Sequence, residues 1–142
     1  MRLVLDTDVM VAAIRSDAGA ARRLLLACLQ RQHLMLVSVP LMIEYEAVMT
    51  RSEHLDAAGL TARDVNALLD AVVVVAKPVR FTFLWRPMLK DPDDDMVLET
   101  AVNGRADRLV TFNRRDFGVA GRQFGIGICS PGDALEAQEK RK

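Results

Sequence analysis

The chain has 142 residues, of which 51% are hydrophobic and 27% are charged, and its 19 basic and 19 acidic residues give a formal net charge of zero. This length fits one domain over residues 1–142, and the composition argues against a disordered or fibrous protein. The balanced charge argues against a protein that coats nucleic acid by bulk charge. No apolar run reaches the roughly 20 residues of a membrane span. Asp6 interrupts the first apolar run too early for a secretory signal. We therefore expect a cytoplasmic protein without membrane contact.

The first part of the chain predicts two strands, each followed by a helix. Residues 3–5 form a short apolar run that stops at a polar turn, as a buried strand does. Residues 18–32 have the apolar pattern of a helix, and residues 34–39 supply a second strand. Pro40 suits the first turn of the next helix, which we expect to run over residues 40–51.

The middle of the chain predicts one capped helix and a segment of open structure. Thr61 and Asp64 are spaced as in a capping box, and the helix that they start runs through Leu69. Residues 72–75 are β-branched, so this tail is either helix or strand. Residues 81–85 fit an edge strand or an extended segment equally well.

The last part of the chain begins with a clear helix start. Asp91 suits a cap and Pro92 the first helical position, and this helix is expected to end at residues 103–104. Four further elements follow: a strand at 108–111, a polar loop at 113–116, a strand within 125–130 and a helix that opens at Pro131. Short apolar runs that alternate with helices predict a three-layer α/β/α domain with a central parallel sheet.

The cysteines and histidines do not indicate a metal site. Cys28 and Cys129 lie in apolar surroundings, so we expect small buried thiols and no disulfide. His33 and His54 are far apart and lack the spacing of metal ligands, so we expect both to be surface or loop residues. The chemistry of this chain is therefore expected to rest on its acids.

Polar side chains follow two of the predicted strands. Asp6 comes directly after the first strand, and ligands of a parallel sheet bind at the carboxyl ends of its strands; the alternative role for Asp6 is a turn or helix cap. Asp8 is either a second ligand or a side chain that fixes the turn. Thr111, Asn113 and Asp116 follow a later strand, where they can orient water or phosphate oxygens or form an ordinary polar connection.

Other acids lie within predicted helices. Asp94 falls on the stripe that should face the sheet, so its side chain is expected to point inward. Asp93 and Asp95 are explained by favourable charge near a helix N-terminus. Glu44 and Glu46 lie symmetrically about the apolar centre of their helix, and spacing alone does not choose between them.

These residues resemble the PIN domain family, a metal-dependent nuclease fold used by the VapC-type toxins of bacterial and archaeal toxin-antitoxin operons. The resemblance spans nearly the whole chain. It is carried by four features: residues 3–9, Glu44, Asp94 with Thr100 and Ala101, and residues 110–117. Residues 91–95 also resemble a PIN subgroup that is described as toxin components.

The resemblance implies a site and an activity. Four acids would bind Mg²⁺ or Mn²⁺ with two polar side chains in support: Asp6, Glu44, Asp94 and Asp116, with Thr111 and Asn113. Carboxylates are the ligands that such hard cations prefer. The implied activity is hydrolysis of RNA by the toxin of a toxin-antitoxin pair, with an antitoxin protein and a homodimer as the implied assemblies. Asp8 stands where the family usually has Asn, and its extra charge would raise repulsion in a metal-free site.

Two other readings of the same residues compete with a nuclease. Asp6 and Asp8 after an apolar strand resemble the nucleophile and acid of haloacid-dehalogenase-type phosphatases, although the chain is short for that fold and no clear lysine motif is present. A PIN fold that has lost catalysis and acts as a binding module is the second alternative. A cluster of like charges is destabilising without a cation, which favours the nuclease.

Overall fold

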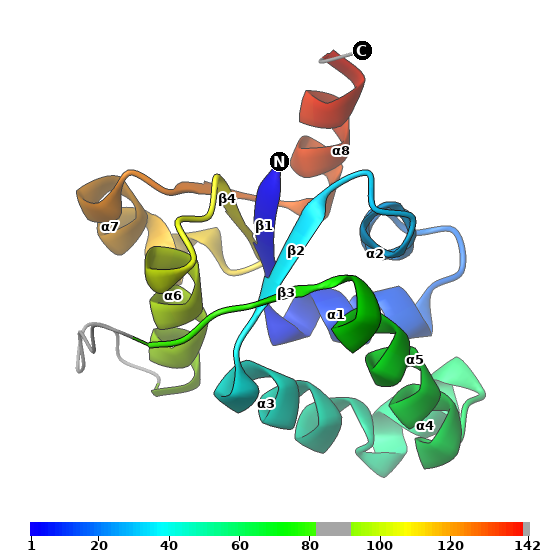
Figure 1. The fold of residues 1–142 in the computed structure, drawn as a ribbon. Helices are drawn as coiled ribbons and strands as arrows, with labels where there is room; N and C mark the ends of the chain where they lie inside the picture. The colour runs from blue at the N-terminus through cyan, green and yellow to red at the C-terminus, as the bar shows by residue number, and fades with distance from the viewer. Residues whose placement is uncertain (82–91, 141–142) are drawn as a thin grey trace.

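The computed structural model describes residues 1–81 and 92–140, which form a central sheet flanked by helices (Figure 1). The strands of these residues are β1 (Arg2–Leu5), β2 (Leu34–Val37), β3 (Lys77–Pro78), β4 (Arg108–Val110) and β5 (Gly127–Cys129). All pairings are parallel, and the strand order is β3-β2-β1-β4-β5. The predicted α/β class with a central parallel sheet is confirmed.

The helices of the described residues cover both faces of this sheet. They are α1 (Thr7–Arg15), α2 (Ala20–Leu29), α3 (Val39–Met49), α4 (Ser52–Ala58), α5 (Ala62–Val75), α6 (Pro92–Asn103), α7 (Arg114–Phe124) and α8 (Pro131–Lys140). α6 packs against β1, β2 and β4, and α7 packs against β5. Figure 1 shows α6 and α7 on one side of the strands and α2, α5 and α8 on the other. No described helix is long and apolar enough to cross a membrane.

The central strands are apolar on both faces because helices cover both faces. Leu3, Val4 and Leu5 of β1 are fully buried, and so are Leu109 and Val110 of β4. A strand of this kind shows a continuous apolar run instead of alternation. This burial agrees with the place of β1 and β4 inside the sheet, where they pair with each other.

The strand order places the ends of β1 and β4 together. Along the chain, β1, β2 and β3 follow one another outward in one direction, whereas β4 and β5 lie on the other side of β1. The direction therefore reverses between β1 and β4, and ligands of open α/β sheets bind at this reversal, outside the carboxyl ends of the strands. Asp6 follows β1 at this place, and Thr111 follows β4.

In the first half of the chain one prediction is wrong, and two predicted helices are present with shorter bounds. The polar turn after β1 is absent, because α1 begins immediately at Thr7, with Asp6 as its cap. The helix predicted over residues 18–32 is the shorter α2. The helix predicted over residues 40–51 ends at Met49, and α4 follows as a separate helix. Short helices of this kind carry few periodic residues, so tertiary packing decides them.

The second half of the chain decides one open alternative and gives two differences. Residues 72–75 are helical and end α5, although they are β-branched. β3 was not predicted. The expected loop at 113–116 is mostly the first turn of α7. Two glycines weaken the helical signal of α7, yet a Cβ on Gly121 would lie 2.6 Å from the Ile128 side chain, so close packing on β5 needs this glycine.

Other predictions are confirmed. Thr61 and Asp64 form a reciprocal capping box. α6 ends at Asn103, and α8 begins at Pro131, as expected. Both cysteines are buried and free. Asp91 and residues 82–85 lie outside the described residues.

Candidate active site

Asp6 lies at the carboxyl end of β1 with both carboxylate oxygens engaged. Its Oδ1 accepts a hydrogen bond from the Thr7 backbone N–H at 2.7 Å, and its Oδ2 accepts one from the Thr111 hydroxyl at 2.8 Å. Behind it, the buried Tyr45 hydroxyl donates to the Leu5 carbonyl. The side chain is 5% exposed, so the strand end, the helix cap and β4 together hold one carboxylate in place.

Asp8 lies in the first turn of α1 and faces the segment after β4. Its Oδ2 accepts hydrogen bonds from the Phe112 backbone N–H at 3.2 Å and from the Asn113 side-chain amide at 3.4 Å. Its Oδ1 is buried and has no hydrogen-bond partner in the part of the chain that the structure describes. A buried carboxylate oxygen without a donor is costly unless a cation or a proton lies against it.

Thr111 and Asn113 link the two aspartates. Thr111 is fully buried, and its hydroxyl accepts a hydrogen bond from the Asn113 backbone N–H at 2.9 Å while it donates to Asp6. Asn113 is exposed and reaches Asp8 with its side chain. The two polar residues predicted as supports thus contact the acid pair directly.

Burial and mutual repulsion perturb the acid pair. Burial raises the pKa of Asp6 to about 7, with a further increase from the nearby Asp8 carboxylate, while hydrogen bonds from Thr111 and Thr7 oppose the increase. Burial also raises the pKa of Asp8, against hydrogen bonds that lower it. At neutral pH one carboxyl group of the metal-free pair therefore holds a proton for much of the time.

A pocket of about 320 Å³ opens in front of the pair. Asp6 and Asp8 line it together with Glu44 from α3, Asp94 from α6 and Asn113. α3 contacts both α1 and α6 at the carboxyl edge of the sheet, which explains how acids far apart in sequence reach one pocket. The inward orientation predicted for Asp94 agrees with this position.

The remaining acids lie elsewhere. Glu46 lines a different, largely apolar pocket between α3 and α5. Asp95 is 3% exposed and does not line the acid pocket. Asp116 is exposed in the first turn of α7 and is also absent from the residues that line this pocket. The structure thus brings three members of the predicted quartet to one pocket and places Asp116 outside it.

Two basic side chains in the pocket were missed by the sequence analysis. Arg51 and His54 from the beginning of α4 also line it. The prediction that His54 is a surface residue is wrong, because its side chain is only 14% exposed. His33 lies in the loop between α2 and β2, as the prediction of a surface or loop residue allows, although it is buried at 6% exposed. No spacing in the sequence indicates these positions, because α4 reaches the pocket by packing on α1.

The chemistry of the acid pair fits Mg²⁺ or Mn²⁺. The donors are carboxylate oxygens, which these ions prefer, and the buried Asp8 Oδ1 lacks a partner that a cation would provide. Among the described residues, however, no group of three or more His, Cys, Asp or Glu side chains is arranged as a complete metal site. Asp6 and Asp8 thus form the centre of a candidate site whose other ligands are water or side chains that must move.

Comparison with known proteins identifies the family. The model of the PIN domain family matches residues 2–115, most of the chain. The chain belongs to the PIN domain family. PIN domains are generally nucleases, which hydrolyse nucleic acids. The matched residues include every acid that lines the pocket and end one residue before Asp116.

A solved structure has the same PIN fold. It is the VapBC2 complex from Rickettsia felis bound to a DNA fragment from its promoter; one of its chains matches with a TM-score of 0.61 and 15% sequence identity, over 90% of this chain and 97% of that chain. At this identity the similarity shows the fold alone. A comparison with curated proteins gave no match.

Proposed function

We propose that this PIN domain is a Mg²⁺- or Mn²⁺-dependent ribonuclease that hydrolyses phosphodiester bonds in RNA. The observation that carries the proposal is the acid pair of Asp6 and Asp8, held by Thr111 and Asn113, with a buried carboxylate oxygen that no described group satisfies. It lies at the carboxyl edge of the sheet and in a pocket with Glu44 and Asp94. A metal-dependent nuclease needs such an oxygen-lined cleft for its divalent ion.

The protein's own residues would each do a limited task in this reaction. Asp6, Asp8, Glu44 and Asp94 would hold the ion, directly or through water. When bound, the ion supplies Lewis acidity toward a phosphoryl oxygen and lowers the pKa of an attacking water. Thr111 keeps the Asp6 carboxylate oriented by its hydroxyl, and Asn113 does the same for Asp8. Asp116 remains a proposed further acid of the site on the family resemblance alone.

Glu44 and Glu46 provide a matched test of the pocket, because both lie on α3 and only Glu44 lines the pocket that contains Asp6. We expect Glu44→Gln to lower RNA cleavage by about 10- to 100-fold, the usual cost of disturbing a group that supports a metal. Glu46→Gln should leave cleavage within about threefold of the wild type, since its pocket is apolar. Cleavage of labelled single-stranded RNA in Mn²⁺ measures both.

The opposite order of effects in these two variants would contradict the assignment of the pocket. An active wild type with two unaffected variants would show that Glu44 has no part in catalysis. A folded wild-type protein that cleaves no RNA in Mg²⁺ or Mn²⁺, but still binds RNA, would favour the binding module that has lost catalysis.

The biological role that fits this activity is the toxin of a toxin-antitoxin pair. The matched Rickettsia felis structure is a toxin-antitoxin complex, and this supports an antitoxin partner for the present chain. We further propose that the protein forms a homodimer and acts in the cytoplasm. The neighbouring reading frame checks the role: a short upstream gene whose product copurifies with this protein and blocks cleavage is expected. Growth unaffected by expression of the active nuclease alone would argue for general RNA processing.

The family match favours a nuclease over a phosphatase of the haloacid-dehalogenase type. In a phosphatase, Asp6 would become an aspartyl phosphate. Incubation with a small phosphomonoester followed by a search for phosphorylated Asp6 separates the two mechanisms.

A further inference from the structure

The acid pocket is also lined by basic and apolar side chains. Arg51, which caps the start of α4, and His54 within α4 line the pocket, and Val11 from α1 and Val48 from α3 add apolar surface. The pocket therefore combines carboxylates, one fixed cation, one imidazole and half-buried valines. Mg²⁺ and Mn²⁺ prefer oxygen ligands, so metal binding alone does not explain the arginine, the imidazole and the valines.

The protonation state of His54 follows from its contact with Arg15. The Arg15 guanidinium Nη1 lies 3.3 Å from His54 Nδ1. A guanidinium has only donors, so Nδ1 must accept, which leaves the imidazole neutral with its proton on Nε2. The Nε2 atom lies 3.8 Å from the nearest Glu53 carboxylate oxygen, which is too far for a hydrogen bond. His54 thus has a neutral N–H donor at Nε2, on a side chain that lines the pocket and is 14% exposed.

We propose that Arg51 and His54 form a nucleotide subsite that binds single-stranded RNA beside the scissile bond. Arg51 supplies the counter-charge for a phosphate, and His54 donates its Nε2 proton in a hydrogen bond to a phosphate or ribose oxygen without transferring it. Val11 and Val48 offer apolar surface to the sugar or base. This inference rests on the proposed ribonuclease function and names how that site holds its substrate.

The dimensions and charges of the site agree with this assignment. A volume of about 320 Å³ is at the low end of the roughly 300–1,000 Å³ of ligand pockets, so it suits one nucleotide. The chain has no net charge, and the acid pair repels RNA, so binding near it requires local cations. Arg51 is such a cation within the pocket itself.

Arg15 is a positioning residue in this arrangement. It is exposed at the end of α1 and acts through His54, whose ring orientation and tautomer it holds. Arg15→Lys keeps a donor to Nδ1, whereas Arg15→Met removes it. Rescue by lysine separates this role from a merely structural one.

Single-turnover cleavage of a short single-stranded RNA in Mn²⁺, titrated with the protein at several salt concentrations, tests the subsite. We expect Arg51→Met to raise the half-saturating concentration about tenfold and to reduce the slope of log affinity against log salt by about 0.7, because one phosphate contact is lost. His54→Ala should weaken binding by a similar factor without changing the slope, since a neutral donor releases no counterion. His54→Gln should retain part of the affinity, and the rate at saturation should change less than threefold in each variant.

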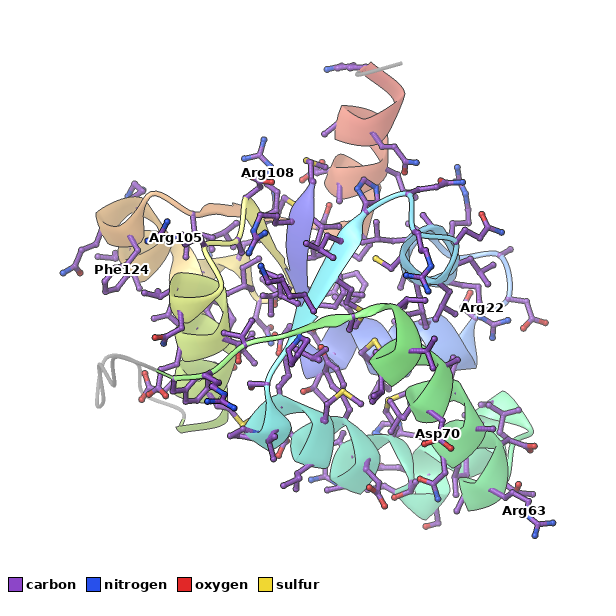
Figure 2. The ribbon with its side chains drawn as sticks, viewed as in Figure 1. Arg22, Arg63, Asp70, Arg105, Arg108 and Phe124 are labelled. Carbon is purple, nitrogen blue, oxygen red and sulfur yellow. The ribbon has the colours of Figure 1, made fainter. Side chains whose placement is uncertain are left out.

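Arg63→Met is the matched control for a lost arginine. Arg63 lies at the start of α5, is exposed, and does not line the pocket; Figure 2 shows it extending outward from the molecule. This variant should retain the affinity and salt slope of the wild type. Thermal unfolding of every variant identifies any that fail to fold. The two Arg15 variants then test the His54 contact independently: Arg15→Met should weaken RNA binding, and Arg15→Lys should retain it.

The outcomes separate the subsite from the proposed function. If the wild type cleaves RNA while Arg51→Met and His54→Ala bind RNA with its affinity, the proposed subsite is wrong and the proposed ribonuclease function is unaffected. A lower salt slope for His54→Ala would overturn the neutral donor, since it would show a charged imidazole. If the folded wild type cleaves no RNA, the proposed function fails whatever the variants do.

Discussion

Asp6→Asn is expected to lower RNA cleavage by more than about 100-fold. Disturbing groups that merely support metal ligands costs about 10- to 100-fold, and Asp6 is the most buried of the acids that line the pocket. The variant should also be more stable than the wild type without metal, because a buried carboxylate beside Asp8 is replaced by a neutral amide of the same shape. Cleavage rate and thermal unfolding, measured on the same preparation, check both results.

Asp116→Asn is the informative comparison for Asp6→Asn. Asp116 is exposed and lies outside the pocket, so we expect a smaller loss of cleavage. An equal loss would show that Asp116 approaches the metal in the working complex, as the family resemblance implies. Retention of full cleavage by Asp6→Asn would contradict the whole assignment of the site.

Divalent metal is expected to raise the melting temperature strongly and in a pH-dependent manner. Binding to the native state alone adds about 2.7 kcal/mol at a metal concentration 100 times the Kd, or roughly 5–10 °C for a chain of this size. Burial, and then the Asp8 charge, raise the pKa of Asp6 from 3.8 to about 7, so protons compete with metal below neutral pH. The increase in melting temperature with Mn²⁺ should therefore be larger at pH 8 than at pH 5.5.

The metal-free protein should show the opposite trend with pH. Between pH 3.8 and about 7, native Asp6 binds more protons than unfolded Asp6, so this group makes stability fall as pH rises through that window. Asp8→Asn should reduce the fall, because the repulsion that helps raise the pKa of Asp6 is removed. Melting temperatures measured in chelator from pH 4 to pH 8 check this. A profile unchanged by Asp8→Asn, together with no response to metal, would contradict the cation site.

Local patterns were sufficient for much of the fold. The apolar run at Leu3–Leu5 identified a buried strand, because a strand covered on both faces needs no polar positions. The Thr61 and Asp64 capping box and Pro131 identified helix starts, because cap chemistry depends on residues close in sequence. The sequence analysis did not predict the helices α1, α4 and α7. Their sequences are short or contain glycine, so they become helical only when they pack against the rest of the domain.

The sequence by itself determined that Asp6 and Thr111 lie at the carboxyl ends of strands, which places both at one edge of a parallel sheet. It did not choose between Glu44 and Glu46 without the family resemblance, because both are equally placed on an apolar helix; the contacts of α3 with α1 and α6 direct Glu44 into the acid pocket and leave Glu46 in another. Only the tertiary structure brought Arg51 and His54 to the same pocket and placed Asp116 outside it. Side chains from separate helices meet through packing between elements, and local spacing carries no information about that packing.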